Sequence, residues 1–232
     1  ATMINRRGLM RTGAAIPLMA IPIFTLGGCA AGMGGFSLVE AIQRLLTLSA
    51  QRAFAQLLQP GGFYDSSVAR IALPDRLASG GNVLTQLLAT QAVRDRLGRT
   101  LNSAAERGAE RAAPVVTDAI RSVSVADALA IVRGGPTAAT ALLEGQLAGG
   151  LVNAMFPAVG DALRLAGDNT VSTVLRSITG YDVASLARDV SDGANRGIWR
   201  AIGAEESAIR ANPQSTNDPL LMGVFGLAAR AG

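Results

Sequence analysis

The residues of this chain with the clearest chemical meaning are the small residues that precede its single cysteine. Cys29 follows Leu26, Gly27 and Gly28 at the end of an apolar run. A lipoprotein signal peptidase needs small residues at these positions, because the backbone must enter its site in an extended form. The cysteine sulfur takes a diacylglycerol before cleavage. The pattern therefore predicts that Cys29 is lipidated and is the first residue of the mature chain.

The residues before Cys29 have the layout of a cleavable signal peptide, which we place at residues 1–28. Arg6 and Arg7 belong to a positively charged start, and residues 14–26 form the apolar core. This core is shorter than the about 20 apolar residues that a membrane-spanning helix needs. The two arginines, followed by apolar residues and a further base, also resemble the twin-arginine export motif. Both the general secretory route and the twin-arginine route stay open.

A rival motif lies a few residues further on. Gly35, Phe36 and Glu40 resemble the cleavage site of a type IV prepilin. A pilin needs a long unbroken apolar helix after that glutamate, and here Gln43 and Arg44 interrupt the apolar run. We therefore favour the lipoprotein signal over the pilin interpretation.

The residue types that are missing exclude several kinds of catalysis. The chain contains no histidine, and a lipidated Cys29 leaves no free thiol. Ser-His-Asp and Cys-His catalysis and histidine-based metal sites are therefore excluded. The glycine pairs lack the context of a phosphate-binding loop. Nothing in the spacing of the acidic residues singles out a catalytic pair. We predict a protein that is not an enzyme and has no metal or cofactor.

The charge of the mature chain is close to balanced. The whole chain has 21 basic and 17 acidic residues. Without the three arginines of the leader, 18 basic residues face 17 acidic ones, so the charge is about +1. This balance predicts no nucleic-acid partner.

Apolar residues recur with helical spacing along the whole mature chain. We predict an all-α fold, with a lipidated tether over residues 29–35 and a single compact multi-helix bundle over residues 36–232. The patterns predict a first helix from Leu38 to Leu57, a second over about 84–113, and one long helix along a stripe from Leu143 to Leu163.

Capping residues place several helix ends. Ser124 with Asp127 predicts a capping box, and Asp182 predicts the start of a last long helix that ends before Pro213. Asp218 precedes a short closing helix. Pro114 stands where a new helix can begin, because the first turn of a helix does not need its missing N–H.

One segment does not follow the helical pattern. Residues 68–73 alternate weakly before Pro74, which predicts an extended strap across the bundle. In the last long helix, Glu206 and Arg210 have the spacing of an i,i+4 ion pair, which we expect on a solvated face.

Five short blocks between residues 38 and 226 carry a family resemblance through their order and spacing. They are Gly62-Phe63-Tyr64 with residues 68–77, Leu101-Asn102 with Ala112-Ala113-Pro114, Ala138-Ala139-Thr140, Phe156-Pro157-Ala158-Val159, and Glu205-Glu206 with Asn212-Pro213. The chain resembles the domain-of-unknown-function 4197 family of helical proteobacterial envelope proteins. The resemblance implies an all-helical fold and a cell-envelope address, and it implies no activity. Ala141 and Leu142 stand where the family usually carries aromatic residues, so a pocket lined by those aromatics would here be wider or absent.

Four residues are candidates for a pocket or for a structural ion pair. Arg70 lies in the strap between apolar neighbours, so we expect it to face a buried carboxylate such as Asp118 or Asp75. Phe156 and Trp199 either pack in the core or line an apolar cavity.

Two functions from different classes agree with these observations. The first is a non-catalytic interaction or scaffold lipoprotein, held in the outer membrane through its lipid and facing the periplasm, with an envelope protein as partner. Ala30 follows the lipidated cysteine, and no aspartate is there to retain the protein at the inner membrane. The second is a carrier of an apolar small molecule or acyl chain inside the bundle. The sequence predicts no oligomeric state.

Overall fold

Seven α-helices and one 3-10 turn follow one another along the part of the chain that this computed structural model describes, residues 30–75, 86, 88–166, 172–173 and 182–226. They are α1 (Ala30–Leu57), α4 (Gln91–Arg121), α5 (Val125–Arg133), α6 (Ala138–Leu147), α7 (Gly150–Leu165), α9 (Val183–Ala211), the 3-10 turn η1 (Pro213–Thr216) and α10 (Pro219–Gly226). The described residues contain no β-strand, which confirms the predicted all-α fold. The predicted signal residues Arg6, Arg7, Leu26, Gly27 and Gly28 and the predicted lipidation residue Cys29 lie outside the described residues.

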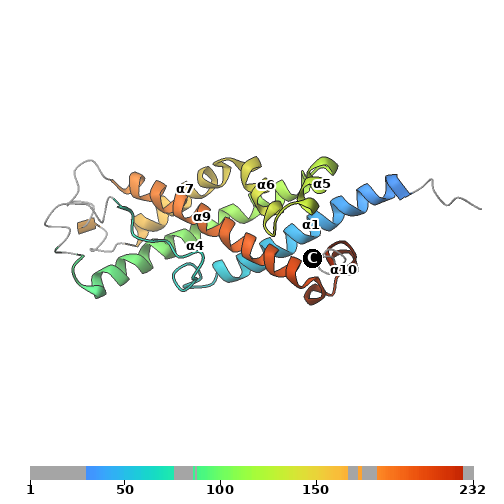
Figure 1. Cartoon of the computed structure of the whole chain (residues 1–232). Helices are drawn as coiled ribbons and strands as arrows, with labels where there is room; N and C mark the ends of the chain where they lie inside the picture. The colour runs from blue at the N-terminus through green and yellow to red at the C-terminus, as the bar shows by residue number, and fades with distance from the viewer. Residues whose placement is uncertain (1–29, 76–85, 87, 167–171, 174–181, 227–232) are drawn as a thin grey trace, which may run out of the picture.

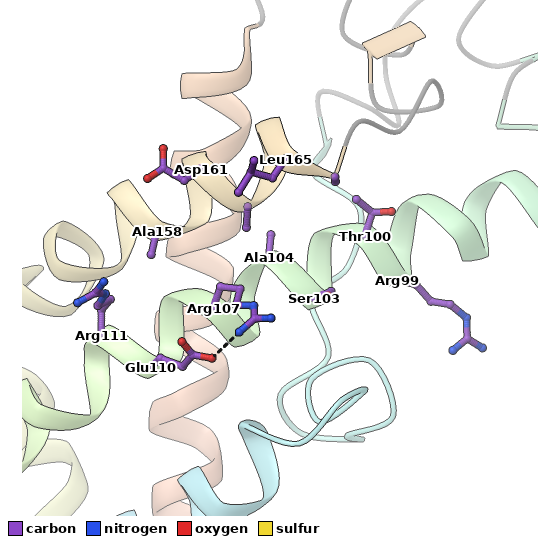
Figure 2. Close-up of a pocket in the computed structure, with 12 residues that line it drawn as sticks. Arg99, Thr100, Ser103, Ala104, Arg107, Glu110, Arg111, Ala158, Asp161 and Leu165 are labelled. Carbon is purple, nitrogen blue, oxygen red and sulfur yellow. Dashed lines mark hydrogen bonds and ion pairs between the residues drawn. The ribbon is translucent and has the colours of Figure 1, made fainter.

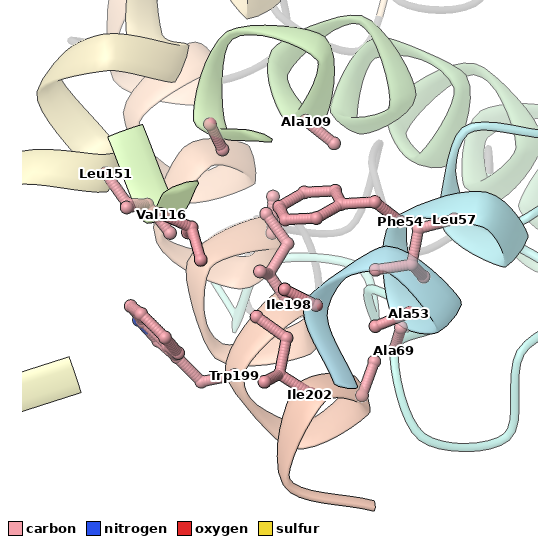
Figure 3. Close-up of a cluster of buried hydrophobic side chains, with 14 of the residues drawn as sticks. Ala53, Phe54, Leu57, Ala69, Ala109, Val116, Leu151, Ile198, Trp199 and Ile202 are labelled. Carbon is pink, nitrogen blue, oxygen red and sulfur yellow. The ribbon is translucent and has the colours of Figure 1, made fainter. Parts of the chain in front are cut away.

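Four long helices form the body of the bundle. The closest pairings are α4 with α7, α1 with α9, and α7 with α9 (Figure 1). Their facing sides carry the buried residues, and Phe54 of α1, Ala109 of α4 and Ile198 of α9 belong to one such cluster (Figure 3). Each large apolar side chain buried in this way stabilises the fold by about 1.5–3 kcal/mol. The apolar stripes of these helices therefore give the bundle most of its stability.

Small residues let the helices approach closely. A β-carbon on Gly108 of α4 would lie 2.7 Å from Val159 of α7. A β-carbon on Gly197 of α9 would lie 2.8 Å from the carbonyl oxygen of Ala69. No larger residue fits at either place without moving a neighbour, so these two glycines set the spacing of α4 to α7 and of α9 to the loop before the strap.

The predicted capping residues lie at the helix ends. Ser124 and Asp127 form a capping box at the start of α5, and the side chain of Asp182 accepts from Ser185 N at the start of α9. The Oδ1 of Asp218 accepts from the first N–H groups of α10. These caps confirm the predicted starts of three helices.

Two predicted helix boundaries are wrong. The chain does not begin a new helix at Pro114, because α4 continues through it to Arg121. Pro114 is exposed, so the carbonyl that loses its N–H partner can bond to water. The single helix predicted along the 143–163 stripe is instead two helices, α6 and α7, since Gly149 adopts a left-handed conformation with φ of 84°. The apolar stripe continues across this break because its residues are buried on both helices, Leu143 on α6 and Leu151 on α7.

The extended strap is shorter than predicted, because residues 67–69 form a turn and the strap begins at Arg70. It crosses the bundle at Ile71, where a buried side chain holds it. Asn102 of α4 accepts from Ile71 N at 2.8 Å and donates to Ile71 O at 3.0 Å. The amide of Asn102 therefore bonds to this residue of the strap as a neighbouring β-strand would. An extended segment can cross a helical surface in this way without leaving its buried backbone groups unpaired.

A third helix boundary also differs from the prediction. Helix α1 begins at Ala30 rather than at Leu38 and so includes residues 30–35. Among the helices that the structure describes, none combines the length and the hydropathy needed to cross a membrane.

Candidate functional site

A buried carboxylate joins α6 to α9. Glu206 of α9 is 0% exposed, and it accepts three hydrogen bonds from the start of α6. The donors are Ala139 N at 3.1 Å, Thr140 N at 2.7 Å and Thr140 Oγ1 at 2.7 Å. The first N–H groups of a helix have no partner within the helix and carry a partial positive charge. A carboxylate accepts their hydrogen bonds and its negative charge is attracted to this end of the helix. We call Glu206, Thr140 and Arg210 the Glu206 staple.

Arg210 completes the staple. Its Nε donates to Glu206 Oε1 at 2.8 Å, and its Nη2 donates to Ile131 O of α5 at 3.2 Å. Its guanidinium lies 4.8 Å from the centre of the Phe225 ring of α10. The expected solvated Glu206–Arg210 pair is therefore wrong, because the i,i+4 spacing predicts that two residues are neighbours but not which face they occupy. The staple joins four helices.

The bonding of Glu206 leaves no place for a substrate. Each of its two oxygens accepts two hydrogen bonds, Oε1 from Ala139 N and Arg210 Nε, and Oε2 from the amide and hydroxyl of Thr140. A general acid or base must reach a reacting group through a free hydrogen-bonding position. This carboxylate is therefore structural.

An apolar groove lies beside the staple. This tryptophan groove has a volume of about 590 Å³ and is lined mainly by apolar surface from Trp199 and Ala204 of α9, Ala141 of α6 and Val68 of the loop before the strap. Trp199 is only 4% exposed, and its Nε1 donates to Asn195 at 3.0 Å. Trp199 thus packs in the core and lines a groove at the same time. Ala141 of α6 has a small side chain and leaves space on the opposite wall.

A second groove lies between α4 and α7 (Figure 2). It has a volume of about 740 Å³. We call it the arginine groove and define it by seven residues, Arg99, Ser103, Arg107 and Arg111 of α4 with Ala158, Ala162 and Leu165 of α7. The residues from α4 are four apart, so they lie along one face of that helix. The residues from α7 form an apolar wall, and Leu165 at its end is 85% exposed.

The ion pairs of the arginine groove are exposed. Arg107 lies 3.0 Å from Glu110, and the two side chains are 68% and 53% exposed. Asp161, on the α7 side, lies 3.0 Å from Arg164. Arg111 forms no ion pair within the described part of the chain. Such exposed pairs hold their partners weakly, so their charges remain open to another molecule.

Tyr64 stacks against two arginines at one end of this groove. The guanidinium of Arg70 lies 3.9 Å and that of Arg99 lies 4.3 Å from the centre of the Tyr64 ring. The ring is held because the Tyr64 hydroxyl donates to Asp95 at 3.3 Å. Arrangements of this kind stabilise by roughly 0.5–1 kcal/mol at exposed sites. Arg99 is therefore oriented before anything binds.

The expected burial of Arg70 is wrong. Arg70 is exposed, and so are both of the carboxylates that we expected as buried partners, Asp75 and Asp118. Asp118 lies 3.1 Å from Arg121. Ala69 ends a turn and Ile71 begins the extended segment. Both of these neighbours are buried, whereas the side chain of Arg70 between them reaches the surface.

Phe156 is half-buried on α7 and packs against the core, with the guanidinium of Arg188 at 4.9 Å from its ring centre. It lines neither groove as defined above. The core interpretation thus fits Phe156 better than the cavity interpretation.

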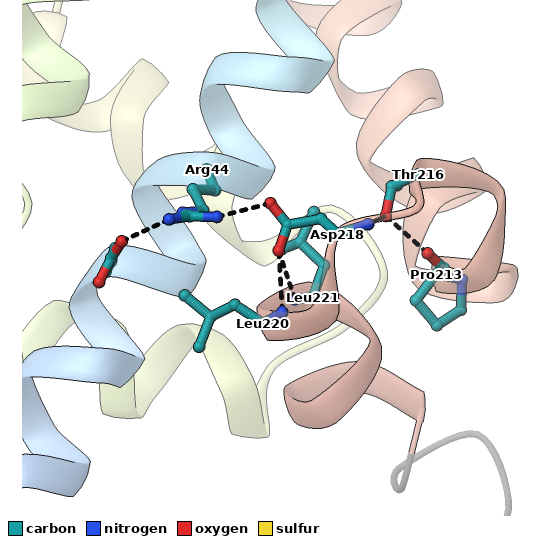
Figure 4. Close-up of polar contacts among 7 residues, drawn as sticks. Arg44, Pro213, Thr216, Asp218, Leu220 and Leu221 are labelled. Carbon is teal, nitrogen blue, oxygen red and sulfur yellow. Dashed lines mark hydrogen bonds and ion pairs between the residues drawn. The ribbon is translucent and has the colours of Figure 1, made fainter.

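The shifted pKa values belong to groups that hold the fold. Arg44 and the N–H groups of α10 hold the pKa of Asp218 below its usual value (Figure 4). Bonds from Ser124 and Ser185 lower the pKa values of the capping residues Asp127 and Asp182. Burial raises the pKa of Glu106, whose carboxylate accepts from Gly61 N.

The residues that the structure describes contain no cluster of side chains suited to holding a metal ion. Within the same residues, every buried side-chain nitrogen or oxygen has a hydrogen-bond partner. The interior therefore presents no unpaired polar atom to a ligand, and the two grooves are the candidate binding surfaces.

Comparison with known families matches residues 33–226 to the family described as "Protein of unknown function (DUF4197)". The chain belongs to this family. The match covers the whole bundle, as the order of the sequence blocks predicted. No curated protein and no solved structure matches the chain.

Sequence reasoning missed three features of the site. It did not place Glu206 in the interior, it did not connect Tyr64 with Arg99, and it did not single out the arginine stripe of α4. Only the stripe has a readable signal, because polar residues recur every four positions from Arg99 to Arg111 on a helix whose other face is apolar.

Proposed function

We propose that this protein is a non-catalytic lipoprotein of the bacterial cell envelope that acts as an interaction or scaffold module. A lipid on Cys29 would anchor it in the outer membrane, with the bundle facing the periplasm. Ala30 after the cysteine supports the outer membrane over the inner membrane. The partner is an envelope protein.

The observation that carries the proposal is the position of the arginine groove relative to the start of α1. This helix begins at Ala30, directly after the lipidation residue, and its first turns extend beyond the other helices at one end of the bundle (Figure 1). The arginine groove belongs to the first half of α4 and the second half of α7, which lie toward the opposite end (Figure 1). An anchored bundle would thus present this groove away from the membrane.

The chemistry of the described side chains favours binding over catalysis. The best-positioned acid, Glu206, has all its hydrogen-bonding positions occupied within the protein. The chain has no histidine and no second cysteine. The arginine groove offers another molecule the guanidinium groups of Arg107 and Arg111, which bind anions but stay protonated at physiological pH.

Metabolic labelling tests the anchor. Cells that produce the full chain are fed an alkyne analogue of palmitate, and the protein is recovered and detected. We expect labelling of the native chain and none of Cys29→Ala. The variant Gly35→Ala should be labelled like the native chain, since the lipoprotein signal does not involve that glycine. Equal labelling of Cys29→Ala and the native chain would overturn the anchor.

Photo-crosslinking in cells tests the interaction surface. A photoreactive residue replaces Ser103 inside the arginine groove, and a matched variant carries it at Thr117, which is also exposed on α4 but lies outside the groove. We expect a defined adduct with an envelope protein from position 103 and none from position 117. The same adducts from both positions, or none from either, would contradict the proposal.

The tryptophan groove favours a second candidate function, a carrier of an apolar small molecule or acyl chain. Its volume of about 590 Å³ lies within the usual range for ligand sites, and its lining is mainly apolar. Quenching of the single tryptophan, Trp199, by a spin-labelled fatty acid would support this function. Replacement of Ala141 by Trp should fill the groove and abolish the quenching. If the fatty acid quenches both proteins equally, the groove is not the binding site.

A further inference from the structure

The arginine groove has the length of a short helix. Arg99 and Arg111 are twelve residues apart on one face of α4, a distance of about 18 Å along the helix axis. The parallel wall on α7 offers Ala158, Ala162 and Leu165, which are also three or four residues apart. A helix of about three turns, with a diameter of about 10–12 Å including its side chains, matches a groove of this length between two helices.

The two walls differ in chemistry. The wall from α4 carries three arginines, and the wall from α7 carries small apolar residues and Leu165, which is 85% exposed. A partner that covers such an exposed apolar side chain removes its surface from water, and this contributes favourably to the free energy of binding. An occupant of the groove therefore needs an apolar face toward α7 and negative charge toward α4.

The positive charge of the groove is not fully balanced by the protein itself. Of the two carboxylates in the lining, Glu110 pairs with Arg107, and Asp161 pairs with Arg164 at the edge. Arg111 has no ion pair within the described residues, and Arg99 is stacked on Tyr64 without a carboxylate. Arg111 therefore remains able to bind a carboxylate of a partner through a pair of parallel hydrogen bonds. Arg107 can do the same, because its exposed pair with Glu110 holds it only weakly.

We propose that the arginine groove binds an acidic amphipathic helix of a partner protein. The apolar face of that helix packs against Ala158, Ala162 and Leu165, and its glutamate or aspartate side chains pair with Arg107 and Arg111. Helices that lie in grooves in this way are recognised through residues at i, i+4 and i+7. The choice of a protein over an anionic lipid surface rests on the proposed anchoring at Cys29, which turns this groove away from the membrane.

Peptide binding to the unlipidated protein tests this inference separately from the anchor. The mature chain, residues 29–232 with Cys29→Ala, contains every described helix. The probe is a fluorescent 18-residue helical peptide with Glu on one face and Leu on the other. Fluorescence anisotropy compares it with a scrambled peptide of the same composition, which keeps the charge but loses the apolar face. We expect the amphipathic peptide to bind at least about tenfold more tightly.

Charge reversal in the groove provides the matched variants. Arg107→Glu with Arg111→Glu should weaken binding of the acidic peptide by at least about tenfold, whereas Arg133→Glu, an exposed arginine on α5, should change it less than about twofold. A second peptide with Lys in place of Glu should bind the double variant more tightly than it binds the native sequence. This rescue requires a folded groove, so it separates lost contacts from lost structure.

Several results would overturn the inference. They are no binding of the amphipathic peptide, equal binding of the scrambled peptide, an equal loss in Arg133→Glu, and no rescue by the Lys peptide. Binding to vesicles that contain phosphatidylglycerol, lost in the double variant, would identify the groove as a membrane surface instead. None of these results depends on lipidation. A failure of palmitate labelling would count against the anchor and leave the peptide measurements as they are.

Discussion

Two arginine–carboxylate pairs of this protein look alike in sequence and differ completely in the structure. Glu206 and Arg210, four residues apart on α9, are 0% and 11% exposed. Arg107 and Glu110, three apart on α4, are 68% and 53% exposed. The buried pair also receives three hydrogen bonds from α6, whereas no other helix that the structure describes donates to the exposed pair. The first pair therefore holds the fold together, and the second leaves its charges available for binding.

This difference predicts the largest effect for the buried carboxylate. Glu206→Ala removes one side of a buried pair. It leaves Arg210 Nε, the Thr140 hydroxyl and two N–H groups of α6 without the carboxylate that accepts from them. We expect a loss of about 3–5 kcal/mol in the free energy of unfolding, measured by urea titration. Glu206→Gln keeps the shape and some of the hydrogen bonds, so it should lose less. A loss below about 1 kcal/mol for Glu206→Ala would contradict the role of the staple.

Loss of the buried amide of Asn102, which is neutral, should also lower the free energy of unfolding, but by less than loss of the buried carboxylate. Asn102→Ala leaves the N–H and the carbonyl of Ile71 buried without their partner. We expect a loss of about 1–3 kcal/mol. Thr117→Ala, exposed on the same helix, is the control and should stay within about 0.5 kcal/mol of the native chain. If the two variants are equally stable, Asn102 does not hold the strap.

The half-exposed pair of Arg44 with Asp218 should give an intermediate effect that depends on pH. Arg44 lowers the pKa of Asp218, so the ionised carboxylate favours the folded state. This contribution is complete above the usual pKa of 3.8 and is lost as the pH falls through the lowered value. In Asp218→Asn, which can still cap α10, the melting temperature should fall less between about pH 6 and pH 3 than in the native chain. An unchanged pH dependence would argue against the pair.

Acid titration of the whole protein combines groups of both signs. Asp127 and Asp182 have lowered pKa values and act like Asp218. Burial raises the pKa of Glu106, so its protonation favours the folded state and opposes the other three. Glu106→Gln should therefore steepen the loss of stability toward low pH, which the same melting series measures.

The smallest effect is expected in the arginine groove. Glu110→Ala breaks only the exposed pair with Arg107, so the free energy of unfolding should change by no more than about 0.5 kcal/mol. The same variant should bind the acidic peptide at least as tightly as the native chain, because it removes a competing carboxylate. A large loss of stability on urea titration would show that the groove supports the fold as the staple does.

The fold was predictable from the sequence wherever a local signal decides the structure. The caps at Ser124, Asp182 and Asp218 hold because a side-chain oxygen next to free N–H groups needs no tertiary contact. The extended strap was predictable from its weak alternation and from Pro74, but its first two predicted residues, 68 and 69, lie in a turn. The break at Gly149 was missed, because the residues of the apolar stripe are buried in both helices and the stripe therefore looks continuous in the sequence.

The candidate site was less predictable, because burial is a property of the whole bundle. Nothing within α9 distinguishes a Glu206 on the surface from one that meets the start of α6. The prediction for Arg70 was wrong in the opposite sense. Its apolar neighbours predicted burial, whereas its side chain is exposed and stacks on the ring of Tyr64. The pairing of α4 with α7 that creates the arginine groove comes from small residues such as Gly108, whose role appears only when both helices are in place.

The most direct test of the separate roles of the Glu206 staple and the arginine groove compares a staple variant with a groove variant. The quantity measured is the rise in melting temperature that a saturating concentration of the acidic peptide causes in each. A ligand that binds only the folded state raises the melting temperature. We predict that Glu206→Gln lowers the melting temperature of the free protein and keeps the rise. Arg107→Glu with Arg111→Glu should keep the melting temperature of the free protein and lose the rise. If both variants change both quantities alike, the staple and the groove do not have separate roles.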